Sequence, residues 1–205
     1  MKRILKYAFR ITHIDNVQHI MKYGIVKKSS QYRDEHYVNI GDPELIRLRG
    51  EFDIQGHRIS DYIPFYLGPR SPMLYVIQHG YNGVKRVDPE KIVYCVVKIE
   101  DLINNGIDCI FTNGHALSEL TSFYTKNDLT RINDIICYED VYSVQWNSES
   151  DIDLKRRKEA ELLVENDLPS SFICGYVVYN DSAKNALIKL GIDKNKIVVS
   201  SRYYF

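Results

Sequence analysis

The sequence predicts a mixed α/β (α+β) fold in a single domain, residues 1–205, in which strands outnumber long helices. The run 91–99, KIVYCVVKI, is apolar and rich in β-branched residues, which is typical of a buried strand. Residues 180–191, NDSAKNALIKLG, have a polar start, a helical period and a terminal glycine. Helices do not alternate regularly with strands, so the pattern does not favour a doubly wound parallel sheet.

The first segments predict a strand, a helix and a loop. Residues 5–12 form the first strand, and a helix follows that Asp15 can cap and Gly24 ends. The polar stretch 27–42 has no regular period and is a candidate loop over a site. Pro43 is suited to start a short helix, which we expect to end at Leu48 or Arg49.

Residues 61–77, DYIPFYLGPRSPMLYVI, predict a strand, a tight turn and a helix. The strand covers 62–67, and Ser71 caps a helix that begins at Pro72 and stops at Gly80. Arg70 therefore precedes a helix N-terminus, which suits an anion. Taken alone, the stretch favours an aromatic core segment with a solvated arginine.

The second half predicts short elements separated by loops. A helix over 100–106 and a strand over 107–112 are followed by loops and by a possible helix at 128–137. We expect strands at 175–179 and 196–205.

Composition narrows the class of protein. Hydrophobic residues make up 44% and charged residues 26%, and Lys plus Arg equals Asp plus Glu at 27 each. A net charge of zero argues against nonspecific coating of nucleic acid, although it leaves room for a local basic groove. The four cysteines show no paired spacing and three lie in apolar contexts, so we interpret them as buried thiols of a reducing compartment: Cys95, Cys109, Cys137 and Cys174. No signal peptide or membrane span is recognisable, and we expect a cytoplasmic protein.

The common motifs for cofactors and metals are missing from the sequence. It contains no GxGxxG, GxxxxGK[ST], HExxH or GxSxG. His13 and His19 have the wrong spacing for two ligands on one helix face. A metal site or a Rossmann cofactor is therefore not expected.

Several isolated polar residues remain as candidates. Arg10, Thr12 and His13 stand at a strand end before a helix, where a phosphate could bind, but solvated or turn roles are equally compatible. Surface solvation is the default for Arg47 and Arg49, and a structural role is the default for His115.

Residues 153–164, DLKRRKEAELLV, are the most informative charged segment. If 160–165 is a strand, Glu161 shares a face with Leu163, and its partly desolvated carboxylate lies close to strong positive charge. The alternative is an amphipathic helix with Glu–Arg pairs at spacing four, and the segment alone favours that alternative.

Four stretches in this order carry a resemblance over essentially the whole chain: YAFRITHIDNVQHIMKYGI, YIPFYLGPRSPMLYVI, IDCIFTNGHA and KRRKEAELLV. Together they resemble the DarT family of DNA ADP-ribosyltransferase toxins. The resemblance implies an ADP-ribosyltransferase-like fold, a split β-sheet with helices around an NAD cleft. It implies transfer of ADP-ribose from NAD, without a metal, to thymine or guanine in single-stranded DNA, which blocks replication. It also implies a macrodomain antitoxin (DarG-like) as partner, and we expect a monomer.

The resemblance also implies site residues. Glu161 matches the catalytic glutamate, Arg49 the essential arginine with Arg47 as fallback, and His115 a histidine near the DNA. The positions matching the NAD site are Arg10, Ile11, Thr12, Arg49, Tyr66 and Met73. Some members have histidine where this chain has Arg10.

The same comparison implies a path for the DNA. The loop from about 115 to 161 corresponds to substrate recognition. The basic residues expected to face DNA or the bound nucleotides are Arg70, Lys155, Arg156, Arg157 and Lys158, and more weakly Lys85 and Arg86. The competing interpretations are an enzyme of the same fold acting on RNA or protein, or an inactive nucleotide- or single-strand-binding module.

Overall fold

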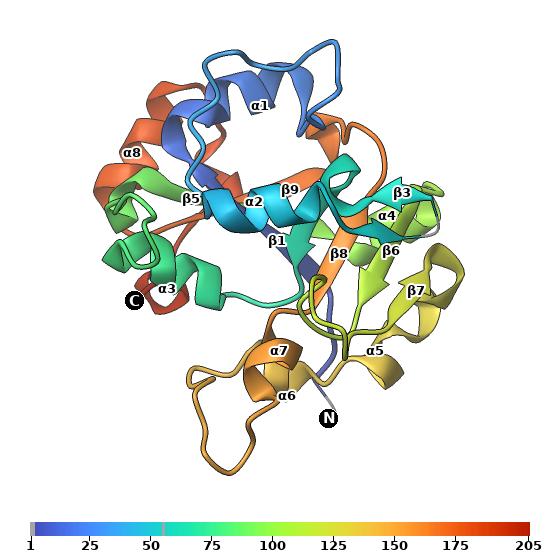
Figure 1. Cartoon of the computed structure of the whole chain (residues 1–205). Helices are drawn as coiled ribbons and strands as arrows, with labels where there is room; N and C mark the ends of the chain where they lie inside the picture. The colour runs from blue at the N-terminus through green and yellow to red at the C-terminus, as the bar shows by residue number, and fades with distance from the viewer. Residues whose placement is uncertain (1–2, 55) are drawn as a thin grey trace.

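The computed structural model of the chain describes residues 3–54 and 56–205. Eight of the strands in this part form one sheet, in the order β10-β9-β5-β1-β4-β8-β6-β7 (Figure 1). In chain order they are β1 (Tyr7–His13), β4 (Ile63–Tyr66), β5 (Ile92–Lys98), β6 (Cys109–Thr112), β7 (Phe123–Thr125), β8 (Glu161–Val164), β9 (Ile173–Val178) and β10 (Ile197–Val199). The short strands β2 (Asp53–Ile54) and β3 (His57–Arg58) pair separately.

Helices surround this sheet. Helix α2 crosses in front of it, α1 and α8 lie at one end, and α5, α6 and α7 lie at the other (Figure 1). Their bounds are α1 (Val17–Tyr23), α2 (Pro43–Arg49), α3 (Pro72–His79), α4 (Ile99–Asn104), α5 (Ile132–Ile135), α6 (Tyr138–Val141), α7 (Leu154–Lys158) and α8 (Asp181–Lys189). The predicted mixed α/β class is confirmed.

The sheet is split between β1 and β4. Strand β1 pairs with β5 along its whole length, from Tyr7 opposite Lys98 to His13 opposite Ile92. Its pairing with β4 is the single pair Phe9–Tyr66, and beyond that point the two strands diverge. One half of the sheet therefore carries β1 and the other carries β4 and β8.

The core is divided in the same way. The largest cluster packs on one face of both halves and includes Cys95, Phe65 and Leu162. Two smaller clusters contain Phe9 and Leu163, which alternate to the opposite face. That opposite face of β8 also carries Glu161. The helix that the segment alone favours covers only Leu154–Lys158, so the strand interpretation is the correct one for Glu161.

Local signals for the turn into α3 are confirmed. The Ser71 hydroxyl accepts a hydrogen bond from the N–H of Leu74, Pro72 is the first helical residue, and Gly80 ends the helix at φ 72°. The prediction that Asp15 caps α1 is wrong, because Asn16 precedes that helix and makes no side-chain cap. The ring of His13 instead accepts a hydrogen bond from the N–H of Asp15.

Two segments differ from the predicted elements. Within 112–128, predicted as loop, β7 pairs with β6, and the predicted helix 128–137 is a 3-10 segment, Lys126–Arg131, followed by α5. The predicted terminal strand 196–205 is strand only in β10 and continues as a 3-10 turn, Ser201–Tyr203. Where the chain leaves the sheet, Tyr204 is buried, and its hydroxyl, with one hydrogen to donate, lies 2.9 Å from Ile92 O and 3.0 Å from Val177 O.

The cysteines are free thiols. Cys95 and Cys109 are buried as predicted, Cys174 is half-buried and Cys137 is exposed. Within residues 3–54 and 56–205, no helix is long and apolar enough to cross a membrane.

Gly68 allows the turn after β4 to approach α6. A Cβ atom at this position would lie 1.9 Å from the carbonyl oxygen of Val141, which is backbone and cannot rotate away. We expect Gly68→Ala to lower the free energy of unfolding by roughly 1–3 kcal/mol or more. Urea denaturation measures this. Gly41→Ala is the control, because its Cβ would make only ordinary contact, 3.4 Å from the Ile46 side chain. Equal stability of the two variants would contradict this account of the turn.

Candidate active site

The centre of the site is a buried ion pair between Arg49 and Glu161. Nη2 of Arg49 donates to Oε2 of Glu161 at 2.6 Å, and Nη1 donates to Oε1 at 3.2 Å. The side chains are 15% and 2% exposed, so water screens this pair weakly. Two parallel N–H···O bonds fix both the position and the orientation of the carboxylate.

Three strands hold Glu161 in place. It is the first residue of β8, directly opposite Tyr66 of β4, which is itself opposite Phe9 of β1. Its backbone N–H donates to the hydroxyl of Thr112 at 3.0 Å. The carboxylate therefore projects from the face that carries Phe9 and Tyr66, beside the split in the sheet.

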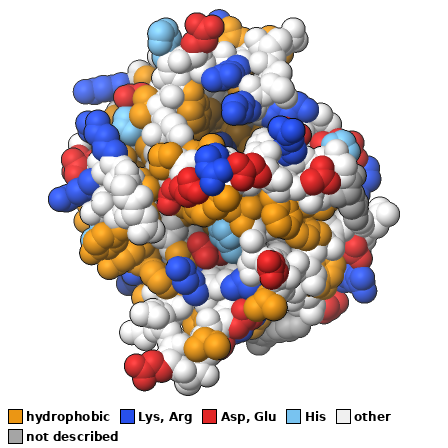
Figure 2. Space-filling model, viewed as in Figure 1, with side chains coloured by type: hydrophobic (Ala, Val, Ile, Leu, Met, Phe, Trp, Pro, Cys, Tyr) orange, Lys and Arg blue, Asp and Glu red, His pale blue; other side chains and the backbone are white. Residues whose placement is uncertain are grey.

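Helix α2 supplies the arginine. The Asp42 carboxylate caps this helix by accepting from the N–H groups of Glu44 and Leu45, and Arg49 is its last residue. Arg47, the fallback, is about half exposed and pairs with Glu44 and Glu51 on the outside of the same helix. Figure 2 shows basic and acidic side chains side by side over α2. Geometry therefore favours Arg49 over Arg47 as the residue of the site.

A loop amide completes the surroundings of Glu161. The N–H of Ala116 donates to Oε1 at 3.2 Å, from the loop that follows β6. This loop is itself held by the N–H of His115, which donates to Arg156 O at 2.9 Å. Sequence reasoning did not find Ala116 or Thr112, because a backbone amide and a threonine in a short loop carry no distinctive signal.

These contacts determine the charge states. Burial acts to raise the pKa of Glu161, but Arg49 and the Ala116 amide outweigh it and hold that pKa below its ordinary value. Burial likewise acts to lower the pKa of Arg49, and Glu161 raises it above the ordinary value. Burial lowers the pKa of His115, against the attraction of Glu161. The pair is therefore ionised at neutral pH, beside a histidine that is mainly neutral.

The β1 residues expected at the NAD site fall on two faces. Ile11 alternates to the face of Glu161 and packs with the Phe9 cluster. Arg10 and Thr12 alternate to the other face. Nη1 of Arg10 donates to Pro64 O at 3.1 Å, across the point where β1 and β4 diverge. The Thr12 hydroxyl accepts from Nδ2 of Asn16 at 2.9 Å.

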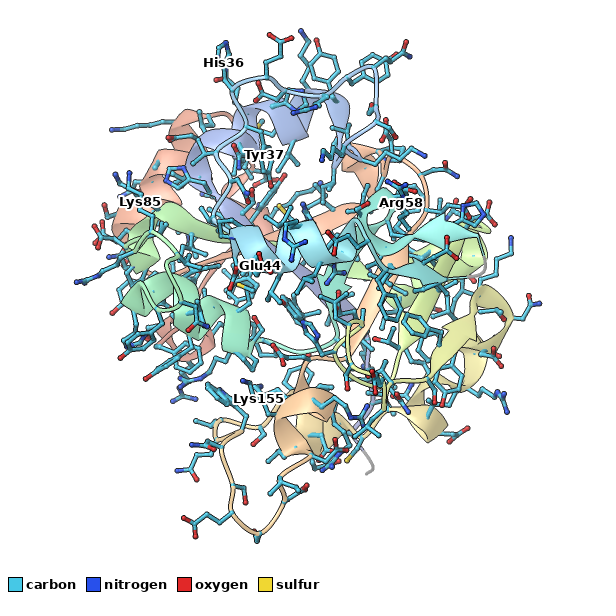
Figure 3. All side chains as sticks on the ribbon, in the orientation of Figure 1. His36, Tyr37, Glu44, Arg58, Lys85 and Lys155 are labelled. Carbon is cyan, nitrogen blue, oxygen red and sulfur yellow. The ribbon has the colours of Figure 1, made fainter. Side chains whose placement is uncertain are left out.

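The loop 27–42 lies over this strand. The hydroxyls of Thr12 and Tyr37 are 3.3 Å apart, and the amide of Asn16 bonds to both the N–H and the C=O of Val38. In Figure 3, His36 lies at the outer side of the loop and Tyr37 lies below it, toward the sheet. The interpretation of 27–42 as an irregular loop is confirmed, and Asn16 fastens it beside β1.

Tyr66 and Met73 lie on the other side of the split. Burial strongly raises the pKa of the Tyr66 hydroxyl, and the carboxylates of Glu161 and Glu159 raise it further. Met73 is half-buried and packs on the cluster that contains Phe9. Tyr66 is therefore a neutral hydrogen-bonding group beside Glu161, and Met73 an apolar wall.

Arg70 makes its contacts with the C-terminal residues. Nη1 donates to Tyr204 O at 2.7 Å, and the guanidinium lies 4.2 Å from the Phe205 ring centroid. Its backbone has φ 54°, and its N–H donates to the Tyr94 hydroxyl at 3.2 Å. The expectation that Arg70 faces bound nucleotides is therefore not supported, since its guanidinium fastens the C-terminus to the turn before α3.

The basic run on α7 is mostly occupied by other contacts. Arg156 pairs with Asp153, and Arg157 pairs with Asp140, Asp151 and Asp153. Lys158 is 1% exposed, and its ammonium donates to Pro69 O and Val141 O, each at 3.1 Å. The expectation that all four residues present free charge to DNA is wrong for Lys158, whose buried ammonium has no access to a groove.

Lys155 is the exposed member of the run. Its ammonium lies 5.8 Å from the Trp146 ring centroid, and it acts on the pKa of both Glu159 and His115. Lys155 lies on α7 at the lower side of Figure 3, whereas Lys85 lies at the left. Lys85 and Arg86 are both exposed, and Arg86 approaches Asp88 at 3.9 Å.

The viewed face of the molecule is hollowed near its centre (Figure 2). The hollow lies between α2 and α7, below a band of hydrophobic side chains, and acidic and histidine side chains are visible inside it. A carboxylate fixed at a split in a sheet, with donors, a neutral histidine and apolar walls, is suited to stabilise positive charge that develops on a bound ligand.

Comparison with known proteins identifies the family. Residues 9–205 match the family described as "DarT: ssDNA thymidine ADP-ribosyltransferase, DarT". A "DNA ADP-ribosyl transferase" of Escherichia coli O127:H6 is 30% identical over 205 residues, covering 96% of this chain and 92% of the relative. The chain belongs to the DarT family. It is a DNA ADP-ribosyltransferase that acts on thymidine in single-stranded DNA, which resolves the choice between thymine and guanine left open by the sequence.

Further relatives share the fold or have a similar sequence. The structure of "Thermus sp. 2.9 DarT in complex with ADP-ribosylated ssDNA" superposes with a TM-score of 0.84 at 23% identity, covering 100% of both chains. A structure of the same Thermus protein holds NAD+. A "DNA ADP-ribosyl transferase-DNA ADP-ribosyl glycohydrolase fusion protein" of Thermosipho africanus is 27% identical over 199 residues, covering 96% of this chain and 48% of the fusion.

The contrast between two arginines on one helix provides a test. Arg49→Ala leaves the Glu161 carboxylate buried without its partner, so we expect ADP-ribosyl transfer to fall by at least about 100-fold. Arg47→Ala removes only exposed ion pairs that water screens, and we expect activity within a few-fold of the unmodified protein. Initial rates with a thymidine-containing single strand measure both. A larger loss in Arg47→Ala than in Arg49→Ala would contradict the assignment.

Proposed function

We propose that the Arg49–Glu161 pair is the catalytic centre of a single-domain enzyme that transfers ADP-ribose from NAD to a thymidine base in single-stranded DNA. The observation that carries this proposal is the ionised carboxylate held at the split in the sheet by two guanidinium N–H groups and one backbone amide. No metal takes part in the proposed reaction.

The split in the sheet is the proposed NAD cleft. Beyond Phe9, the edge of β1 that faces β4 has no strand pairing among the described residues, so the backbone groups of Ile11 are available to a ligand, whereas those of Arg10 and Thr12 point toward β5. Ile11, Tyr66 and Met73 supply the walls. Because the Arg10 side chain bonds to Pro64 O, we assign this residue a role in shaping the cleft.

The proposed chemistry begins with cleavage of the nicotinamide–ribose bond. Cleavage gives an oxocarbenium-like transition state, as in glycoside transfer, and the Glu161 carboxylate stabilises the positive charge. Arg49 keeps that carboxylate ionised and oriented. A guanidinium has five N–H donors, of which two are used here, so the others remain to contact the diphosphate or the acceptor base.

Single-stranded DNA is proposed to approach past α3 and α7. A half-buried aromatic cluster lies here, in which Tyr75 contacts Trp146 and Phe205 at centroid distances of 5.6 Å and 5.0 Å. Lys155 lies between Trp146 and the His115–Glu159 region. Bases that stack on aromatic rings while phosphates meet a lysine are the usual mode of single-strand binding. Arg156 and Arg157 act in this scheme by fixing the loop from 115 to 161.

Lys155 should contribute about one phosphate contact. We expect Lys155→Gln to weaken binding of single-stranded DNA and to reduce the slope of log K against log salt by about 0.7. Fluorescence anisotropy at several salt concentrations measures this slope. The control is Lys189→Gln, on the exposed face of α8. An unchanged slope in Lys155→Gln would place the DNA elsewhere.

The reaction itself is tested by mass spectrometry. The protein is incubated with NAD and mixed-sequence single strands, with duplex DNA, RNA and the protein itself as alternative acceptors. Addition of one ADP-ribose to thymidine-containing single strands is expected, and fragmentation locates the base. Labelling of RNA or protein instead would be compatible with the same fold, but it would show that the acceptor is not single-stranded DNA.

Glu161→Gln keeps the side-chain volume and removes the charge. We expect transfer to fall by about 1,000-fold or more, since electrostatic stabilisation is the largest contribution in such sites. Circular dichroism and the melting temperature check that the variant is folded. Glu100→Gln, exposed on α4, is the matched control. Full activity of folded Glu161→Gln would show that Glu161 is not the catalytic residue.

A protein partner of ADP-ribosyl glycohydrolase type is also proposed, which makes this chain the toxin of a toxin–antitoxin pair. The support is the Thermosipho relative, in which a transferase and a glycohydrolase are one chain. A macrodomain antitoxin (DarG-like) would remove the mark from DNA and allow replication to resume. Expression of this chain alone should halt growth, and co-expression of such a hydrolase should restore it.

A further inference from the structure

A second carboxylate lies beside Glu161. Glu159 is only 9% exposed, two residues before Glu161 at the end of α7. In the described part of the chain its carboxylate makes no hydrogen bond and no ion pair. Across residues 3–54 and 56–205, the only completely buried side-chain N or O without a partner is Nε of Arg70, so the Glu159 oxygens retain access to solvent. Buried acids are rarely left unpaired.

The neighbours of Glu159 come from α7, β8 and β4. Lys155 and Lys158 lie on its own helix, Glu161 follows on β8, and Tyr66 lies on β4. The Lys158 ammonium is bound to two carbonyl oxygens, which limits its availability to Glu159. Burial raises the pKa of Glu159 to about 7, with a further increase from Glu161, against the opposing effects of Lys155 and Lys158.

Glu161 is poorly placed to act as a base. Both of its oxygens already accept hydrogen bonds, from Arg49 and from the Ala116 N–H, and its pKa is held low. A carboxylate so strongly stabilised in its ionised form accepts protons weakly. When their environments give two neighbouring carboxylates different pKa values, one commonly acts as the acid or base and the other stabilises charge.

Thymine presents one ring N–H in DNA, at N3, because N1 carries the deoxyribose. That N–H is a weak acid, so attack by N3 on a ribosyl cation-like centre requires a group that removes the proton. We propose that Glu159 is this general base, while Glu161 stays ionised and stabilises the ribosyl centre. This assignment rests on the proposed role of Glu161 in NAD cleavage.

The step balances as follows. The C1′–N bond of NAD breaks, and its electron pair leaves with nicotinamide, which departs as a neutral molecule. The N3 electron pair of thymine forms the new bond to C1′, and the N3 proton moves to a Glu159 carboxylate oxygen. Glu159 then returns the proton to water. The net proton release is one for each ADP-ribose transferred.

Glu159→Gln is the variant that tests the proposal. We expect kcat for transfer to thymidine to fall by about 100-fold, the lower range for loss of a general base. In the unmodified protein kcat/KM should rise through about pH 7, as Glu159 loses its proton, and in the variant this rise should disappear. Replacing the target thymidine by 5-fluorodeoxyuridine, whose ring N–H is more acidic, should restore most of the lost rate.

The matched variants separate this role from others. Glu161→Gln should lose transfer to both acceptors, and Glu100→Gln should change neither. Equal loss of both acceptors in Glu159→Gln would indicate a structural role and overturn the proposal, as would a rate within threefold of the unmodified protein. A flat wild-type profile between about pH 6 and 8 would overturn it independently of how the variant folds. Absence of any transfer by the unmodified protein would overturn the proposed function, and the role of Glu159 with it.

Discussion

The bidentate ion pair between Arg49 and Glu161 is the interaction on which the site depends. It joins the end of α2 to the first residue of β8, segments separated by 112 residues along the chain. A buried ion pair contributes little net stability, because desolvation opposes the attraction, but loss of one partner leaves a costly unpaired charge. The pair therefore constrains the geometry of the fold. Because neither charge can remain buried without the other, α2 must lie across the split sheet.

The rest of the fold supports that constraint. The sheet divides after the Phe9–Tyr66 pair, and Glu161 lies next to Tyr66 at the same level. Lys158 donates a hydrogen bond to Pro69 O in the turn after β4. Arg70 of the same turn donates to Tyr204 O and so joins the turn to the C-terminal residues. Most of the basic residues that were predicted to contact DNA thus hold the walls of the site in place. Lys155 is the exposed basic residue on α7.

Much of this could be predicted from the sequence, for identifiable reasons. Capping by Ser71, the glycine stop at Gly80 and the apolar run of β5 are local signals, and each was correct. The resemblance implies Arg49, with Arg47 as fallback, but the residues alone do not choose between two arginines on one short helix, because only tertiary contact with Glu161 distinguishes them. The unpaired state of Glu159 was equally hidden, since a charge run in sequence does not show which members find partners.

The measurement that tests the central claim most directly is the titration of the Glu161 carboxyl group by ¹³C NMR, in the unmodified protein and in Arg49→Ala. If the pair sets the charge of the site, the pKa of Glu161 lies below the ordinary glutamate value in the unmodified protein despite its burial. In Arg49→Ala it should rise above that value, because only the effect of burial would remain strong. An unchanged pKa in Arg49→Ala would contradict the account.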